Sequence, residues 1–251
     1  MRLRSVIPRL VSLSVPVLAA PFAFAGPPYV TDDPEPVEYQ HFEINFAIQY
    51  QHERHDDFFP ALPYIEINYG AATDLQLSIT APMVRDKESG DESKYGYGDT
   101  QLGFKYRFVH ETASLPQFTF FPLLNLPTGD PGRGLGNGKP QLFLPLWAQK
   151  SWDEDKWTLY GGGGWWYNPG SNNKDFWQFG AVLQRKVTEH IALGLELYQF
   201  TRSTDDGQAS TGFNLGAVID LSENHHILFS AGRDFSGPNL FSFYLAYQLT
   251  F

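Results

Sequence analysis

The residues that could do chemistry form no complete catalytic or ligand-binding motif. The Gly-rich run Gly132–Pro140 superficially resembles a phosphate-binding loop. In that motif Arg133 would stand where the first glycine is required, and Pro140 where Ser or Thr is required, so the resemblance fails. We therefore interpret this run as a mobile Gly-rich loop.

A second candidate is the run of histidines and acids from His52 to Asp57, which could bind a divalent cation. A solvated charge run on a surface loop is the more common meaning of such a segment, and we prefer that interpretation. The sequence has no Cys, no H-E-x-x-H and no G-x-S-x-G. We expect no catalytic residue, no metal site and no cofactor, and therefore a protein that is not an enzyme.

Composition narrows the class of protein further. The 251 residues include 18 Lys and Arg against 28 Asp and Glu, which gives a net charge of −10. Such an acidic chain lacks the basic surface that nucleic-acid binding needs, so we expect no nucleic-acid partner. A mean hydropathy of −0.30 argues against a helical membrane bundle. It does not argue against a membrane β-barrel, because the polar lumen of a barrel lowers the average.

Residues 1–25 have the form of a secretory signal peptide. A basic start with several Arg residues is followed by a short apolar stretch and by Ala23-Phe24-Ala25, an A-x-A cleavage site. The apolar stretch is too short to act as a membrane-spanning helix. We expect export through the secretory pathway, with Gly26 as the new N-terminus.

Residues 41–251 alternate between apolar and polar side chains. In the clearest segment every even position from Phe42 to Tyr50 is apolar, and the odd positions are mostly polar. Successive side chains of a β-strand face opposite sides, so each segment has one apolar and one polar face. We count about 12 such segments, joined alternately by long loops and short turns. The pattern predicts an all-β, up-and-down antiparallel transmembrane β-barrel with both termini periplasmic, closed by pairing of 240–251 with 41–51.

Three features favour a barrel in lipid over a soluble one. All six Trp residues fall at predicted strand ends, where they would form girdles at the two membrane interfaces. The predicted inner face carries many glycines, which would leave voids in a packed soluble core. The last strand alternates aromatic or Leu residues and ends at Phe251, and it resembles the signal read by the outer-membrane barrel-assembly machinery. We therefore expect an outer-membrane protein whose partners are the lipid bilayer and that machinery.

The polar faces of the strands would enclose a lumen, and the side chains on them are the candidate functional residues. They could form a polar translocation path with a charged constriction, or a mutually neutralising network that holds the barrel closed. The sequence leaves both open, because a 12-stranded barrel is intermediate between a filled and a water-filled one. The predicted lumen-lining residues are Glu43, Asn45, Gln49, Glu66, Asn68, Gln76, Lys105, Arg107, Glu196, Asn214 and Asp220.

A Pro-rich segment, residues 26–40, precedes the first strand. Its prolines forbid a helix or a central strand. Two placements stay open for this segment: a small plug folded into the lumen, or a periplasmic tail outside it.

Several stretches resemble a family of proteobacterial outer-membrane proteins named after a proposed role in the meta-pathway of phenol degradation. They are Gly26–Glu38, Tyr95–Phe108, Pro127–Asp130 and Ser210–Gly216, which together span nearly the whole mature chain. Members of this family are often called transporters. The resemblance implies an outer-membrane barrel that passes small aromatic or hydrophobic compounds.

The leading hypothesis is accordingly a channel or transporter for small-molecule solutes. The alternative is a closed outer-membrane barrel that acts through its outer rim and loops, either as a lipid-modifying enzyme or as a structural or surface-interaction protein. Solute permeation through reconstituted protein would favour the first. Lipid hydrolysis, or partner binding that depends on a long loop, would favour the second.

Overall fold

Fourteen β-strands form one continuous antiparallel sheet in the computed structural model, which describes residues 28–53, 56–88 and 92–251. The predicted signal peptide lies outside these ranges. Within them no helix is long and apolar enough to cross a membrane. The strands are β1 (Phe42–Glu53), β2 (Asp56–Ala72), β3 (Leu75–Glu88), β4 (Lys94–Tyr97), β5 (Thr100–Val109), β6 (Gln117–Phe120), β7 (Leu123–Leu126), β8 (Gln141–Trp152), β9 (Trp157–Tyr167), β10 (Phe176–Thr188), β11 (Ile191–Phe200), β12 (Ser210–Asp220), β13 (His225–Ser236) and β14 (Asn239–Thr250).

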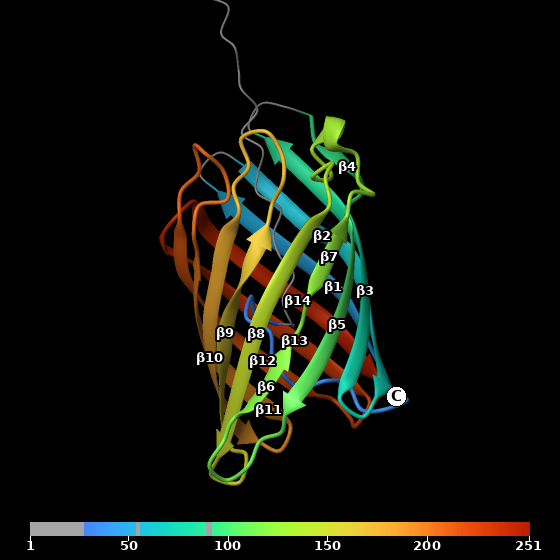
Figure 1. The fold of residues 1–251 in the computed structure, drawn as a ribbon, viewed down its shortest axis with the longest axis vertical. Helices are drawn as coiled ribbons and strands as arrows, with labels where there is room; N and C mark the ends of the chain where they lie inside the picture. The colour runs from blue at the N-terminus through green and yellow to red at the C-terminus, as the bar shows by residue number, and fades with distance from the viewer. Residues whose placement is uncertain (1–27, 54–55, 89–91) are drawn as a thin grey trace, which may run out of the picture.

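These fourteen segments make twelve barrel strands. β4 and β5 both pair with β3, so together they are one interrupted strand. β6 and β7 likewise share β5 on one side and β8 on the other. Pro122 lies between β6 and β7, where a residue without an N–H cannot donate to the ladder. The predicted up-and-down barrel of about 12 strands is confirmed (Figure 1).

The sheet closes between its first and last strands. β1 pairs antiparallel with β14, from Glu43 opposite Thr250 to Glu53 opposite Asn239. Beyond the ladder, the backbone N–H of Phe42 donates to the Phe251 carbonyl at 2.7 Å, and the two rings lie 5.5 Å apart. Closure pairs the backbone groups that an open sheet edge would leave exposed to lipid. The predicted pairing of these two strands is therefore confirmed.

The apolar side of each strand faces outward. On β11, Leu193 and Leu197 are 48% and 53% exposed, whereas Glu196 between them is fully buried. On β1, Asn45 is buried and its neighbour Phe46 is exposed. The barrel thus presents an apolar belt to its surroundings and a polar face to its interior, as the alternation predicts.

The predicted placement of all six Trp residues in interfacial girdles is wrong for two of them. Trp147 and Trp166 are buried inside the barrel, whereas Trp152 and Trp177 are exposed on the outside. The prediction considered only the distance of each Trp from its strand end. The alternation places Trp147 and Trp166 on the same face as their inward neighbours Phe143 and Gly164, and that face decides their position.

The two ends of the barrel differ. One end, which we call the turn end, carries short turns such as 153–156 and 221–224 together with Phe42 and Phe251. The other, the loop end, carries longer loops such as 127–140 and 168–175. The Gly-rich loop is held in place by Asp99, whose carboxylate accepts from the backbone N–H groups of Gly129 at 2.9 Å and Asn137 at 2.7 Å.

Candidate functional site

Residues 28–38, which we call the N-terminal segment, lie inside the barrel (Figure 1). Tyr29, Thr31 and Asp32 are each less than 5% exposed. The chain enters from the turn end, where Gln40 has a φ of 66° and its N–H donates to the Gly70 carbonyl at 2.7 Å. A Cβ on Gly70 would lie 1.9 Å from the carbonyl oxygen of Glu38, so only glycine allows this close approach.

Glycines on the inner wall make room for the segment. A Cβ on Gly180 would lie 1.9 Å from Oγ1 of Thr31, and one on Gly194 would lie 2.1 Å from Oη of Tyr29. Gly216 on the next strand faces the same tyrosine ring. The small residues that the sequence places on this face therefore shape a hollow that fits these two side chains.

Glu196 binds the backbone of the segment on the β11 side. Its carboxylate accepts from the N–H groups of Val30 at 3.1 Å and Thr31 at 2.6 Å, and from Nδ2 of Asn214 at 2.7 Å. Gln178 completes the contact by donating Nε2 to the Val30 carbonyl at 3.1 Å. Three of these contacts hold the backbone of Val30 and Thr31 against the wall, and the charge-assisted bonds to Glu196 are stronger than neutral ones.

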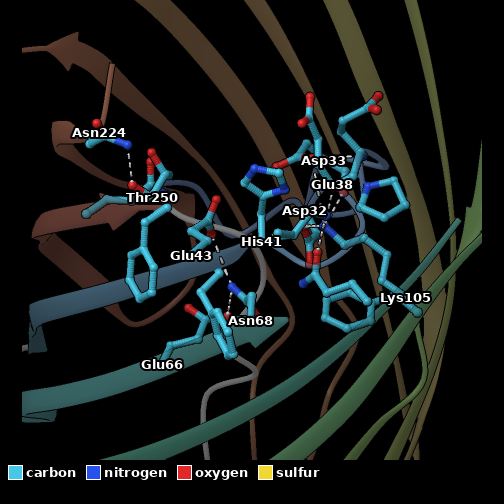
Figure 2. A pocket seen from close by; sticks show the side chains of 18 of the residues that line it. Asp32, Asp33, Glu38, His41, Glu43, Glu66, Asn68, Lys105, Asn224 and Thr250 are labelled. Carbon is cyan, nitrogen blue, oxygen red and sulfur yellow. Dashed lines mark hydrogen bonds and ion pairs between the residues drawn. The ribbon is translucent and has the colours of Figure 1, made fainter. Parts of the chain in front are cut away.

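The β5 and β6 side holds the acidic residues of the segment. Nζ of Lys105 lies 3.0 Å from Oδ1 of Asp32 and 3.7 Å from Oδ1 of Asp33 (Figure 2). The Arg107 guanidinium pairs with Glu35 and, at 3.0 Å, with Asp74. The segment is thus bound by opposite charge on this wall and by backbone recognition on the other.

Two glutamates and two asparagines form a separate polar group on β1 and β2. Nδ2 of Asn68 donates to Oε1 of Glu43 at 3.1 Å and to Oε1 of Glu66 at 3.4 Å (Figure 2). Nδ2 of Asn45 donates to the same two carboxylates at 3.2 Å and 3.3 Å. The two carboxylates are therefore held by amide groups from within the wall.

A cavity of about 460 Å³ opens between the segment and the wall at the turn end. Asp32, Glu43, Glu66 and Lys105 line it together with Phe121. Its volume falls in the range of small-molecule pockets. Within the residues that the structure describes, no three His, Asp or Glu side chains are placed to hold a metal ion.

An aromatic cluster fills the interior nearer the loop end. The rings of Phe143 and Trp166 stack 4.5 Å apart with an interplanar angle of 7°, and Phe176 stacks on the other side of Trp166 at 5.6 Å. Phe121 and Trp147 belong to the same buried cluster. Nε1 of Trp166 donates to Gln178, and Gln178 donates to the N-terminal segment. Gln178 therefore links the aromatic cluster to the segment by hydrogen bonds.

The eleven residues predicted to line the lumen fall on the same alternating strand faces as buried residues such as Asn45, Asn68 and Glu196. Gln76, Lys105, Arg107 and Glu196 contact the N-terminal segment directly. Gln49 lines a small cavity beside Tyr29. Asp220 instead accepts from His226 at the turn end. The other members form the polar group on β1 and β2 or, in the case of Asn214, support Glu196.

Sequence reasoning missed several residues that bind the segment. Gln117 and Thr119 on β6 contact Glu35 and Pro34, and Ser230 on β13 donates to the Pro28 carbonyl. Their strands alternate less clearly in sequence. Strand alternation could still have found Gln117 and Thr119, because residues two apart in a strand point to the same face.

A closed barrel with an apolar belt and a polar interior defines the class of outer-membrane β-barrels, and the comparisons agree. The barrel is similar to an outer membrane channel from Pseudomonas putida F1, with 19% identity and a TM-score of 0.70 over 87% of this chain and 98% of that one. It is also similar to the KdgM porin, with 10% identity and a TM-score of 0.57 over 83% and 99% of the two chains. The chain belongs to the family described as "Putative MetA-pathway of phenol degradation", whose model matches residues 40–251. No curated protein matches the sequence.

Proposed function

We propose that this protein is a channel for small compounds with apolar or aromatic parts, and that the N-terminal segment is its movable plug. The observation that carries the proposal is the way in which the segment is bound. It is a separate stretch of chain, docked mainly by polar side chains such as Glu196 and Lys105 in a hollow shaped by glycines. Withdrawal of the segment would leave a continuous barrel wall around an interior narrowed by the aromatic cluster.

The aromatic cluster supports the class of solute. Phe143, Trp166 and Phe176 form a stack on adjacent inward faces, and aromatic rings pack favourably on such surfaces. Polar solutes gain little from such a wall. A small compound with an aromatic or apolar part would compete for the same ring contacts that now close the interior.

The proposed orientation puts the turn end in the periplasm. Short turns and both chain ends lie on the periplasmic side of bacterial barrels, and the longer loops face outward. The C-terminal strand ending at Phe251 would then be presented to the barrel-assembly machinery. The cavity lined by Lys105 and Glu43 would open to the periplasm.

Removal of the plug is the direct test of the channel. A variant lacking residues 28–38 should raise single-channel conductance in planar bilayers and speed the swelling of liposomes in small aromatic solutes, because the segment would no longer block the space beside the aromatic cluster. Replacing each acid of the segment by its amide keeps its length but removes its pairs with Lys105 and Arg107, and it should give a smaller increase than the deletion. A deletion variant that migrates as a folded barrel in an unheated gel but passes no ion and no solute would refute the channel.

The filled interior also supports a second candidate, a closed barrel that acts through its rim and loops. The segment and the aromatic cluster together occupy much of the lumen, and Leu135 of the Gly-rich loop is buried against the loop end. This candidate predicts that deletion of residues 28–38 lowers barrel stability without creating permeability. Lipid hydrolysis by the pure protein, or partner binding lost on trimming residues 129–138, would establish it.

A further inference from the structure

The acidic side chains of the N-terminal segment occupy a site on the wall that is itself built to bind a carboxylate. Glu35 shows this most clearly. One of its carboxylate oxygens pairs with the Arg107 guanidinium, and the other accepts from Nε2 of Gln117 at 2.8 Å. Gln117 is fixed in turn, since its Oε1 accepts from Arg107 at 3.3 Å. A guanidinium and an amide N–H on the two oxygens of one carboxylate form a two-point recognition site.

Lys105 provides a second cation two residues along the same strand. It is 4% exposed, and its ion pairs in the described structure are with Asp32 and Asp33 of the segment. Its Nζ also donates to the carbonyl oxygens of Asp33 at 2.8 Å and Glu35 at 3.4 Å. If the segment left, this buried ammonium would lose every one of these partners, and a buried cation without an anion is costly.

The other acids of the cavity do not substitute for the segment. Glu43 and Glu66 are held by the amide groups of Asn45 and Asn68, at 3.1 to 3.4 Å. Asp74, at the neighbouring turn, pairs with Nε and Nη2 of Arg107, so the Nη1 group that binds Glu35 stays available to another carboxylate. Displacement of the segment would therefore expose a positively charged patch on β5 with an amide donor beside it.

An aromatic ring adjoins the Lys105 cation. The ammonium of Lys105 lies 5.0 Å from the centroid of the Phe121 ring, and both residues line the 460 Å³ cavity. Phe121 is part of the cluster that includes Phe143 and Trp166. A cationic pair next to an aromatic wall matches one kind of molecule, a small ring compound that carries a carboxylate.

We propose that Lys105, Arg107, Gln117 and Phe121 form a binding site for small aromatic carboxylates, and that Asp32 and Glu35 of the segment occupy it as an internal competitor. This proposal rests on the channel function and adds the class of solute to it. A carboxylate solute that binds here pairs with Lys105 and Arg107 in place of the plug. Binding of the solute is therefore coupled to release of the segment. Because the segment is tethered, its effective concentration is high, and the full-length chain binds the solute weakly until the segment's acids are removed.

Binding of benzoate to the full-length protein in detergent, measured by isothermal titration calorimetry, tests the site. Benzyl alcohol and benzylamine serve as probes with the same ring and a different charge. The variant Asp32→Asn/Glu35→Gln should bind benzoate about tenfold or more tightly than the unaltered protein, because the two carboxylates that lie nearest Lys105 and Arg107 are gone. In that background Arg107→Gln should remove most of this gain, Arg107→Lys should restore part of it, and benzyl alcohol should respond to none of these changes.

Two control variants separate the site from a general effect of charge. Glu43→Gln/Glu66→Gln removes two acids from the same cavity that are bound to Asn45 and Asn68, and it should raise benzoate affinity much less than Asp32→Asn/Glu35→Gln does. Arg185→Gln makes the same Arg-to-Gln change beside Trp157, outside the site. An equal gain in the Glu43/Glu66 variant would overturn the proposal. So would benzyl alcohol or benzylamine binding as tightly as benzoate, or an Arg107→Gln variant that migrates as a folded barrel and still binds benzoate normally.

The outcome also distinguishes this site from the channel itself. If benzoate binding follows the variants while the plug-deleted barrel passes no solute, the site stands and the channel fails. If the plug-deleted barrel passes benzyl alcohol and benzoate equally, with no benzoate binding that depends on Arg107, the channel stands and the carboxylate site fails.

Discussion

At the scale of single residues, Glu196 has the most direct effect on the interior. It is fully buried and, among the described residues, it accepts from two backbone N–H groups of the segment and from Asn214 and pairs with no cation. A buried carboxylate of this kind is stable only while its hydrogen-bond donors are in place. The segment and Glu196 therefore depend on each other.

Glu196→Gln should loosen the segment selectively. Glutamine offers one acceptor oxygen, and its NH₂ group would face a backbone N–H, so at least one charge-assisted bond worth about 1.5–3 kcal/mol is lost. Hydrogen exchange at the amides of Val30 and Thr31 should speed up at least about tenfold. Glu43→Gln is the matched control, since Glu43 is a carboxylate of the same interior whose hydrogen bonds, in the part of the chain that the structure describes, are with Asn45 and Asn68. Equal exchange rates in the two variants would contradict this role for Glu196.

At the scale of elements, the strands could be predicted and the segment could not. Alternation reports directly which side chains share a face, so the fold, the closure of β1 on β14 and the inward position of residues such as Lys105 follow from it. The segment has no periodicity, and its partners are far away in sequence: Thr31 and Glu196 are 165 residues apart. The same rule applied to Trp147 and Trp166 would have placed them inside, whereas distance from the strand end misplaced them.

The glycine hollow can be tested by filling it. Gly180→Leu should push the segment out of the interior, because even its Cβ would overlap Oγ1 of Thr31, while β10 keeps its ladder. Proteinase K should then cleave within residues 28–38, and the barrel should keep its heat-resistant folded form in gels. Ala181→Leu adds the same side chain to the outer face of the same strand and should leave the segment protected. Protection of the segment in both variants would show that the hollow does not set its position.

At the scale of the whole molecule, the barrel wall has an apolar outer face and a polar inner face, and it encloses the N-terminal segment. The outer face is apolar and carries side chains such as Leu195 and Leu215 at 44% and 56% exposure. The inner face binds a stretch of the same chain much as it would bind a ligand, with cations, amides and rings that need a partner. The polar interior and the plug therefore depend on each other, because buried cations on the barrel wall need an anionic partner.

If the apolar belt faces lipid, the cost of placing a charge on it should depend on how deep the residue lies in the bilayer. Leu195→Arg, in the middle of β11, should lower the free energy of unfolding in phospholipid vesicles by about 2–4 kcal/mol, because a cation near the bilayer midplane is poorly solvated. Leu221→Arg, in the turn after β12, introduces the same side chain at a residue that is 61% exposed, and it should cost about 1 kcal/mol or less. Chemical denaturation in vesicles measures both values. Equal losses would mean that the two leucines meet the same solvent, which a membrane-spanning β11 does not allow.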